Sequence, residues 1–264
     1  MYPVIIELGP ITVYSFGLMM AVAFLVGANL LGRELDRKGY DREIASSLMI
    51  WAAVGGLVGA RLWLVIDKWQ SFLADPIGSL VSGAGFVWYG GLIGGALAVG
   101  WVARRRYNLP FLRVADCAAP GLALGHGIGR LGCQLAGDGD WGSVTTLPWG
   151  MAYTNAIIGW DYPPGVKVHP APLYEMIAYF AVAALLWRWR TAPERDGAIF
   201  AWYLILSSVI RFLVEFVRIN PAVWLNLTAA QVTSVMLLVV GAGLLVLVRA
   251  PTGGPATVIA GKRT

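Results

Sequence analysis

The chain is poor in charged residues and lacks several patterns that soluble functional proteins display. Only 13% of its residues are charged, whereas soluble domains carry about a quarter. The two cysteines, Cys117 and Cys133, would lie about 24 Å apart on one helix, too far for a disulfide. The sequence has no His/Cys spacing typical of zinc and no basic stripe interleaved with aromatic residues. We therefore expect neither a soluble enzyme, nor a metal site, nor nucleic-acid binding.

The sequence is rich in long apolar runs. Apolar residues make up 58% of the chain, and its 12 tryptophans and 10 tyrosines suit the aromatic belts of membrane interfaces. A helix needs about 20 mostly apolar residues to cross the hydrocarbon core. The windows that qualify are 11–32, 44–66, 84–103, 114–136, 172–187, 197–217 and 228–248. The fourth contains Pro120 and several glycines, and the fifth is short. No basic residue precedes Arg33, unlike in a cleavable signal peptide, so we expect the first window to be retained as a span.

The basic residues predict how these spans are oriented. Most of them lie in 33–43, 104–113, 188–196 and the tail from 249 onward, whereas the opposite loops contain only Lys68, Lys167 and Arg218. Because Lys and Arg concentrate in cytoplasmic loops, we expect an all-α, polytopic membrane protein with seven transmembrane helices, its N-terminus outside and its C-terminus inside. Residues 1–249 would form a single transmembrane domain with an outer, periplasmic head segment at about 137–171. Residues 250–264 would form a disordered cytoplasmic tail.

The segment 125–142 carries the strongest functional signal. It places His126, Arg130, Asp138 and Asp140 among glycines in a chain that is otherwise soluble in hydrocarbon. A cation buried in lipid is costly unless something anionic meets it, so ionisable residues inside a membrane indicate function. Glycine allows a backbone or a ligand to approach closely. We therefore expect the protein to bind an anionic lipid headgroup.

Three arginines are expected at a similar depth in the bilayer. Spans two, four and six run in the same direction, and the helical rise places Arg61, Arg130 and Arg211 about 21–26 Å above the inner boundary. The outer end of the bundle would also receive Tyr89, Asp138, Asp140, His169, Tyr174 and Glu175. One polar chamber open toward the outer leaflet would account for all of these positions.

Simpler interpretations stay open for several of these residues. Arg211 could be neutralised by the carboxylate four residues after it. Arg61 could be an arginine that extends to the interface. Arg130, by contrast, is flanked by glycines and has no carboxylate within one turn, which favours a functional role.

Other residues have equally plain structural alternatives. Gly90 and Gly91 could serve close packing between helices, which is compatible with facing a ligand. His126 could be a hydrogen-bonded histidine of the bundle, and Cys133 a small packing residue. The sequence does not decide between these roles.

Six short motifs follow one another along the chain. They are Phe16-Gly-Leu-Met, Gly59-Ala-Arg61, Tyr89-Gly-Gly-Leu-Ile-Gly94, Gly129-Arg130-Leu-Gly132, His169-Pro-Ala-Pro-Leu-Tyr174-Glu175 and Arg211-x-x-x-Glu215-Phe-x-Arg218. In this order and at these separations they resemble the motifs of bacterial prolipoprotein diacylglyceryl transferase, along nearly the whole chain. Tyr89 stands where that family has histidine, and Phe16 and Ser207 stand where it has tyrosine. The segment that begins at Cys133 replaces its Asn-Phe-x-Asn-Gly-Glu.

The resemblance implies an activity and a location. The enzyme would transfer the sn-1,2-diacylglyceryl group from phosphatidylglycerol to the lipobox cysteine thiol of a prolipoprotein and release glycerol phosphate. Its partners would be phosphatidylglycerol and the prolipoprotein signal peptide, in the bacterial inner (cytoplasmic) membrane, and no cofactor is expected. The alternatives are a paralogue that uses another acceptor and a non-catalytic membrane protein that binds lipid.

The resemblance also implies roles for individual residues. The catalytic candidates are Arg130, Arg211, His169, Glu215 and Tyr89. The substrate-binding candidates are Arg61, Arg130, Gly90, Gly91, Cys133, Asp138, Asp140, Tyr174 and Glu175. Arginine's planar donor fork suits a phosphate, and clustered cations would also lower the pKa of an attacking thiol. The proton acceptor would be His169, Glu215 or one of the aspartates.

Overall fold

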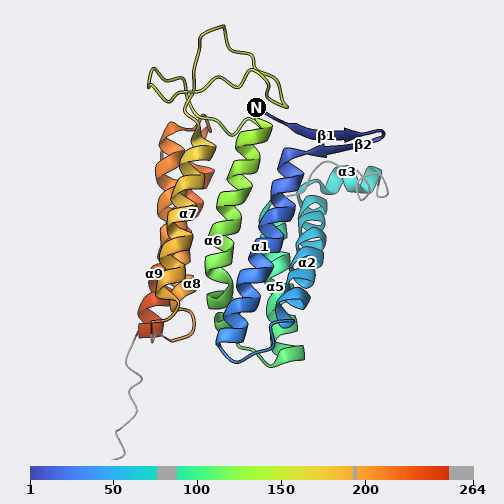
Figure 1. Ribbon diagram of the computed structural model, residues 1–264, viewed down its shortest axis with the longest axis vertical. Helices are drawn as coiled ribbons and strands as arrows, with labels where there is room; N and C mark the ends of the chain where they lie inside the picture. Colours follow the sequence, from blue (N-terminus) through green and yellow to red (C-terminus); the bar gives the residue numbers. More distant parts are fainter. Residues whose placement is uncertain (76–87, 193–194, 250–264) are drawn as a thin grey trace, which may run out of the picture.

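The computed structural model describes residues 1–75, 88–192 and 195–249, and describes only the backbone of Ile11, Ser71, Ala74, Trp88 and Tyr89. The described chain forms a bundle of long helices with α6 in its middle (Figure 1). The long helices are α1 (Ser15–Arg37), α2 (Ile44–Asp67), α5 (Trp88–Tyr107), α6 (Phe111–Ala136), α7 (Ala171–Trp189), α8 (Ala198–Val214) and α9 (Ala229–Arg249). Each covers most of one predicted apolar window. Residues 84–87 of the third window and the predicted tail 250–264 lie outside the described residues.

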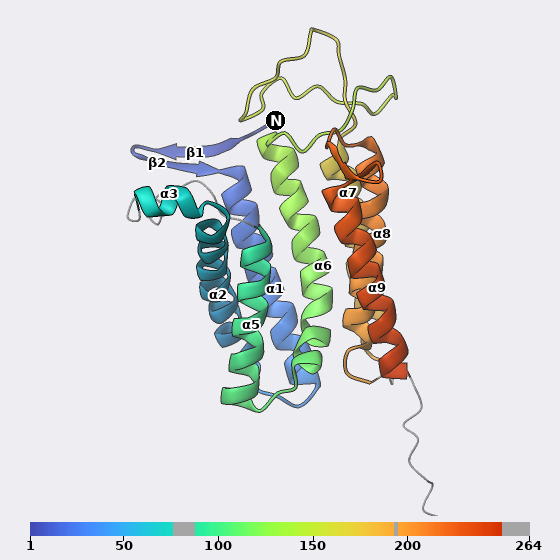
Figure 2. The ribbon, with the colours of Figure 1, turned by 180° about the vertical axis from the view of Figure 1, so that it is seen from behind.

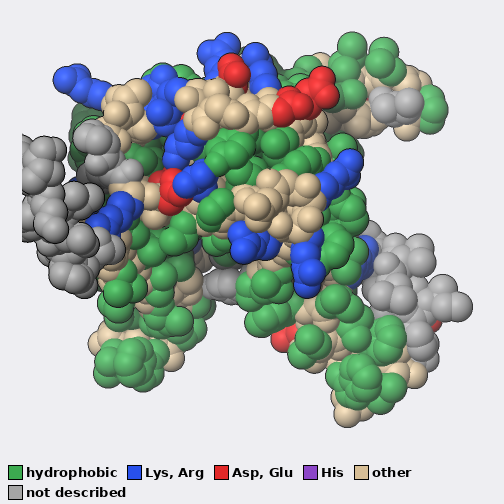
Figure 3. Space-filling view, turned by 90° about the horizontal axis from the view of Figure 1, so that it is seen from below, with side chains coloured by type: hydrophobic (Ala, Val, Ile, Leu, Met, Phe, Trp, Pro, Cys, Tyr) green, Lys and Arg blue, Asp and Glu red, His purple; other side chains and the backbone are tan. Residues whose placement is uncertain are grey.

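The chain is a mostly helical membrane protein. In the part of the chain that the structure describes, four helical segments are long and apolar enough to cross a membrane: α1, α2, α9, and α8 together with the 3-10 helix η1 (Glu215–Val217). Helices α5, α6 and α7 have 20, 26 and 19 residues and run alongside them in the same bundle. Lysine and arginine side chains are spread over the lower end of the molecule (Figure 3). Seven crossings and their orientation stay predictions.

The fourth apolar window forms one continuous helix, α6, in spite of Pro120. Its glycines lie where neighbouring helices approach. A Cβ on Gly121 would lie 3.3 Å from a backbone oxygen of α1, and one on Gly127 would collide with Phe180 of α7. Helix α6 therefore packs against α1 on one side and α7 on the other, and it joins the two halves of the bundle (Figure 2).

Two short hairpins add strands that the apolar windows do not predict. Strands β1 (Val4–Leu8) and β2 (Ile11–Tyr14) pair antiparallel before α1, and β3 (Ala222–Trp224) and β4 (Leu227–Thr228) pair between α8 and α9. The short helix α3 (Trp69–Ala74) lies in the loop at 67–83, between the second and third apolar windows, and beside the first hairpin (Figure 1). Residues 76–83 of that loop lie outside the described residues.

The segment between α6 and α7 covers the upper ends of these two helices, where the sequence predicts a head. Isolated bridges hold it together, and Trp141, Tyr153 and Val168 form its buried core. The Tyr153 hydroxyl donates to Oε1 of Gln134 on α6, at 2.7 Å. Burial raises the pKa of Tyr153, so the hydroxyl keeps its proton and remains a donor. This hydrogen bond fixes the head on the end of α6.

At the lower end, Asp116 of α6 caps the beginning of α8. Its carboxylate accepts the backbone N–H of Gly197 at 2.7 Å and that of Phe200 at 2.8 Å. A carboxylate at a helix N-terminus satisfies otherwise unpaired N–H groups and interacts favourably with the helix dipole. This contact fixes α6 relative to α8, the two helices that carry Arg130 and Arg211.

Candidate functional site

A cluster of charged side chains lies where α6, α7 and α8 meet the head. Arg130, near the end of α6, contacts Oδ2 of Asp140 through Nη1 and Oε2 of Glu175 through Nε. Asp140 belongs to the head, and Glu175 lies in the first turns of α7. Arg130 therefore finds its carboxylates on other elements and not on its own helix.

Arg211 joins the same cluster from α8. Its Nη1 lies 3.0 Å from Oε1 of Glu175 and 2.8 Å from Oε2 of Glu215, four residues later in the chain. Arg211 therefore pairs with Glu215, as the sequence allows, but also with Glu175 of a different helix. The two oxygens of Glu175 face different arginines, so this carboxylate brings Arg130 and Arg211 together.

Arg218 is the third arginine of the cluster. Its Nη2 contacts Oδ1 of Asp140, and its other nitrogens lie 4.0 Å from Glu175 and 3.7 Å from Glu215. A backbone bridge between Gly142 and Arg218 brings this residue beneath the head. Arg218 is not among the predicted site residues, although it completes the motif that begins at Arg211.

The cluster is balanced in charge and deeply placed. It contains Arg130, Arg211 and Arg218 against Asp140, Glu175 and Glu215. The side chains of Glu175 and Glu215 are 0% exposed, whereas Asp140 is 30% exposed. Burial on its own would raise the pKa of Asp140, but the hydrogen bond from Arg218 and the charge of Arg130 outweigh it and hold this pKa below its ordinary value. Buried charges need such partners, because desolvation is otherwise too costly.

Glu215 is also held from the beginning of α9. Its Oε1 accepts hydrogen bonds from Nδ2 of Asn220 at 2.6 Å and from the Thr228 hydroxyl at 2.8 Å. The Thr228 N–H in turn donates to Gln231 at 3.0 Å. The carboxylate that accompanies Arg211 is therefore fixed by neutral donors, and its position does not depend on the arginines alone.

His169, Tyr174 and Trp149 form a second polar group beside the cluster. The Tyr174 hydroxyl lies 3.2 Å from Nδ1 of His169, and Nε1 of Trp149 donates to it at 2.8 Å. The Tyr174 oxygen thus accepts the indole N–H of Trp149 and shares a second hydrogen bond with Nδ1 of His169. Gly142 donates to the His169 carbonyl at 2.8 Å, and a Cβ there would collide with His169 and Val217. A glycine at 142 is thus required for this approach.

Cys133 and Asp138 lie next to Arg130. Nη1 of Arg130 is 3.9 Å from Sγ of Cys133, and Asp138 accepts the Asp140 N–H at 3.3 Å. Ligand atoms of Cys133, Asp138 and Asp140 lie within 4.8 Å of one another, close enough to share a metal ion. However, each oxygen of Asp140 already contacts a guanidinium, so a cation would have to displace an arginine. This geometry favours an anion site more than a metal site.

The other residues singled out in the sequence lie on α2, α5 and α6. Arg61 lies on α2, which packs against α5 and α1, whereas α1 and α6 lie between α2 and α8 (Figure 2). Tyr89 belongs to α5, and its side chain lies outside the described residues. His126, from α6, stacks on Tyr179 with 3.9 Å between ring centroids. The roles predicted for Arg61 and Tyr89 stay predictions.

Gly90 and Gly91 lie where α5 contacts α2. A Cβ on Gly90 would collide with the carbonyl of Gly59, and one on Gly91 would lie 3.4 Å from the carbonyl of Gly56. Such backbone-to-backbone approach is typical of small residues at membrane helix interfaces. Packing therefore accounts for both glycines, and their predicted contact with substrate stays a prediction.

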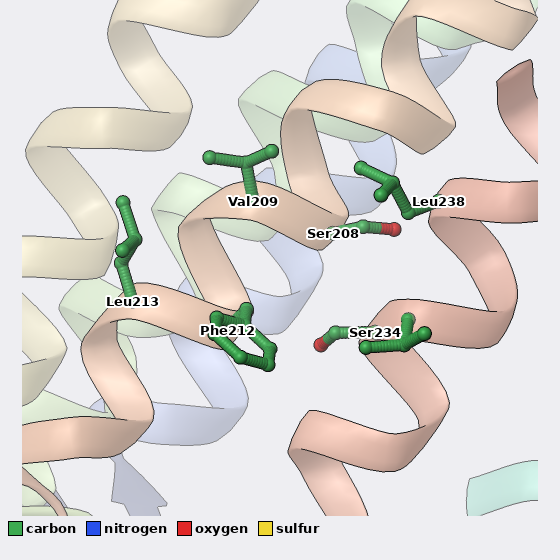
Figure 4. Close-up of a pocket in the computed structure, with 7 residues that line it drawn as sticks. Ser208, Val209, Phe212, Leu213, Ser234 and Leu238 are labelled. Carbon is green, nitrogen blue, oxygen red and sulfur yellow. The ribbon is translucent and has the colours of Figure 1, made fainter.

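A small apolar pocket lies between α8 and α9 (Figure 4). Its volume is about 190 Å³, and it is lined by Ser208, Val209, Phe212, Leu213, Ser234, Val235 and Leu238. The hydroxyls of Ser208 and Ser234 point into the space between the two helices. Ser208 is 3% exposed, and its hydroxyl finds no hydrogen-bond partner among the described residues. The lining residues of α8 precede and follow Arg211, so the pocket lies along the same stretch of helix as this arginine.

Sequence reasoning left out Arg218, Asn220 and Thr228. One available signal was the spacing of Arg218, three residues after Glu215 and directly past an apolar window. The contacts of Asn220 and Thr228 depend on the β3–β4 hairpin, which returns the chain toward α8. No periodic pattern in the sequence predicts this hairpin.

Comparison with known proteins identifies the family of the chain. A family model described as prolipoprotein diacylglyceryl transferase matches residues 3–247. The chain is 33% identical over 243 residues to the phosphatidylglycerol–prolipoprotein diacylglyceryl transferase of Clostridium tetani, covering 91% of this chain and 95% of that protein. It is 34% identical to that of Bacillus cytotoxicus, covering 95% and 93%, and 37% identical to that of Chromohalobacter salexigens, covering 82% and 79%.

Proposed function

This chain belongs to the prolipoprotein diacylglyceryl transferase family, and from that premise we propose that it transfers the diacylglyceryl group of phosphatidylglycerol to a prolipoprotein. It is a transferase of lipoprotein biosynthesis that acts at a membrane. The acceptor is the lipobox cysteine that follows the signal peptide of the substrate. The observation that carries the proposal is the cluster of Arg130, Arg211 and Arg218 at one end of the membrane helices.

The reaction exchanges one bond at a glycerol carbon for another. The cysteine sulfur attacks the carbon that bears the phosphate ester, and a carbon–sulfur bond forms while the carbon–oxygen bond breaks. The electron pair of that bond leaves with glycerol phosphate, and the thiol proton passes to a base. The protein must therefore stabilise charge on the leaving phosphate and favour the thiolate form of the acceptor.

The arginines meet the first requirement. Arg130 and Arg211 hold the donor phosphate and stabilise the charge that develops on it, because a guanidinium presents paired donors that match phosphate oxygens. The fully buried Glu175 supports the role by fixing both guanidinium groups. The positive charge beside the acceptor also lowers the thiol pKa.

His169 is the best candidate for the proton acceptor. Glu175 and Glu215 are fully buried, and both oxygens of each carboxylate are already engaged by arginines or neutral donors. His169 is only partly buried, and its imidazole contacts no arginine among the described residues, so a ring nitrogen can receive a proton. It accepts the proton at Nδ1 once the Tyr174 hydroxyl rotates away, while Trp149 keeps that hydroxyl oxygen in place.

We propose the membrane arrangement that the sequence predicts. The proposed domain is residues 1–249, with seven crossings, the head on the outer side and the tail on the inner side of a bacterial cytoplasmic membrane. The lower end of the molecule is basic (Figure 3), and Arg37 and Arg104 lie in the last turns of α1 and α5, which supports this orientation. The arginine cluster then faces the outer leaflet, where a translocated signal peptide presents its cysteine.

The test is a transfer assay with purified protein in phosphatidylglycerol vesicles and a lipobox peptide. We expect the peptide to gain the mass of a diacylglyceryl group on sulfur, and to gain nothing when its cysteine is replaced by serine. Arg130→Ala should abolish the product, whereas Arg104→Ala, at the opposite end of the bundle, should not. Failure of the folded protein to form any product would refute the proposal.

Two other outcomes would identify the alternatives. Consumption of phosphatidylglycerol without modification of the peptide would indicate another acceptor. Binding of phosphatidylglycerol that depends on Arg130, without any covalent product, would indicate a non-catalytic lipid-binding protein.

A further inference from the structure

The anion-binding position of the cluster is already filled by a side chain of the protein. Asp140 bridges two arginines, with Oδ2 on Arg130 and Oδ1 on Arg218. A phosphodiester has one negative charge and two non-bridging oxygens, as a carboxylate does, and guanidinium groups bind both by the same paired geometry. Asp140 therefore presents to these arginines the chemistry that a phospholipid would present.

Charge balance makes the two anions compete. The cluster holds three guanidinium groups and three carboxylates, so a phosphodiester added to it would create an excess negative charge in a site that is largely shielded from water. Charge left without a partner in such a place is strongly unfavourable. Binding of the donor phosphate thus requires one carboxylate to leave the arginines.

The structure identifies which carboxylate can leave. Glu175 and Glu215 are fully buried, and Glu215 is also held by Asn220 and Thr228. Asp140 is the most exposed of the three, and it lies outside any helix, directly after Gly139 with its φ of 91°. Its side chain can turn outward without moving a helix.

We propose that Asp140 occupies the donor's phosphate position in the empty enzyme and is exchanged for the phosphodiester when the donor binds. This inference rests on the proposed function only in taking a phospholipid as the ligand. It assigns Arg218, together with Arg130, to the phosphate site. It also makes Asp140 a residue that sets donor affinity, because each binding event must first break its two contacts with arginine.

The first test is the affinity of Asp140→Asn for phosphatidylglycerol, measured by titration of the purified protein and by KM in the transfer assay. The substitution keeps the shape and removes the competing charge, so we expect affinity to rise about tenfold, the effect of losing one modest ion pair. Inorganic phosphate should likewise become a better competitor. Asp161→Asn, which removes an exposed charge elsewhere in the head, should leave both values unchanged.

The result that overturns the exchange is unchanged or weaker binding by folded Asp140→Asn. The same exchange can be followed in the unaltered protein by hydrogen exchange of the amides in 137–142. Phosphatidylglycerol should make these amides exchange faster, whereas diacylglycerol, which lacks the phosphate, should not. Slower or unchanged exchange with phosphatidylglycerol contradicts the proposal even if the variant does not fold.

These readouts also separate this inference from the proposed function. Unchanged affinity of Asp140→Asn together with normal transfer would refute only the exchange. Increased affinity of Asp140→Asn, with no transfer product from the unaltered protein, would leave the exchange standing and refute the transferase assignment.

Discussion

Glu175 on α7 and Arg211 on α8 form an ion pair of 3.0 Å in which the carboxylate is completely buried. The second oxygen of the same carboxylate contacts Arg130 on α6. One side chain thus joins three helices and fixes the spacing of the two arginines that we assign to phosphate. The stability of the bundle and the geometry of the site depend on the same group.

Glu175→Gln should therefore destabilise the protein strongly. The substitution removes a buried carboxylate from two partly buried guanidinium groups, and breaking a buried ion pair costs about 3 kcal/mol or more. Unfolding of the purified protein in detergent measures this change. Glu7→Gln, in the exposed part of the first hairpin, is the matched control and should have little effect. Equal stability of the two variants would contradict the role given to Glu175.

Replacing the phosphate-binding arginines by lysine should impair catalysis more than folding. Arg130→Lys and Arg211→Lys keep the charge but lose the planar fork that matches two phosphate oxygens. We expect kcat/KM to fall about a hundredfold in each case, the typical cost of losing one donor to a developing anion. The transfer assay gives this ratio, and Arg104→Lys at the lower end provides the control. Full activity of Arg130→Lys would show that a point charge is sufficient there.

The sequence predicts the long helices well because the bilayer restricts what can cross it. Each spanning segment must be apolar and must satisfy its backbone internally, so hydropathy locates α6 in spite of Pro120. The β1–β2 and β3–β4 hairpins are too short to give a comparable pattern. Their positions depend on tertiary contacts.

The same reasoning explains which site residues were predicted. Helical rise fixes the depth of Arg130 and Arg211, and the structure brings both to Glu175. The helical rise gives the depth of a residue along its helix but not which helices are neighbours in the bundle. The depth that Arg61 shares with Arg130 and Arg211 therefore does not place it beside them. Arg218 was counted as a loop residue because charge counting ignores the backbone bridge that brings it under the head.

Removing the unpaired hydroxyl of Ser208 should stabilise the protein. This residue is 97% buried, and its hydroxyl has no partner among the described residues, so it has lost hydration without compensation. Ser208→Ala should raise the free energy of unfolding by about 1 kcal/mol. Ser207→Ala is the control, because the Ser207 hydroxyl donates to the Leu204 carbonyl at 3.2 Å and should give no gain. A loss of stability in Ser208→Ala would mean that the hydroxyl has a partner in the membrane.

The ion pairs of Asp140 should make stability depend on pH in the acid range. Burial alone would raise its pKa, but Arg218 and Arg130 together lower it. A carboxyl group whose pKa is lower in the folded state stabilises the fold above its unfolded pKa of about 4, and this contribution is lost as the pH falls through the folded value. Asp140→Asn should thus be less stable than the unaltered protein at neutral pH, and the difference should disappear in acid.

Melting temperatures of both proteins, measured in detergent from about pH 7 to about pH 3, give this difference directly. Phosphatidylglycerol should reduce it at neutral pH, because a phosphodiester would then take the place of the carboxylate on Arg130 and Arg218 in both proteins. A difference that is independent of pH would mean that the charge of Asp140 contributes nothing to folding. A difference that phosphatidylglycerol leaves untouched would mean that lipid and carboxylate bind at separate places, and the arginines would then have to bind the phosphate on a face that Asp140 does not cover.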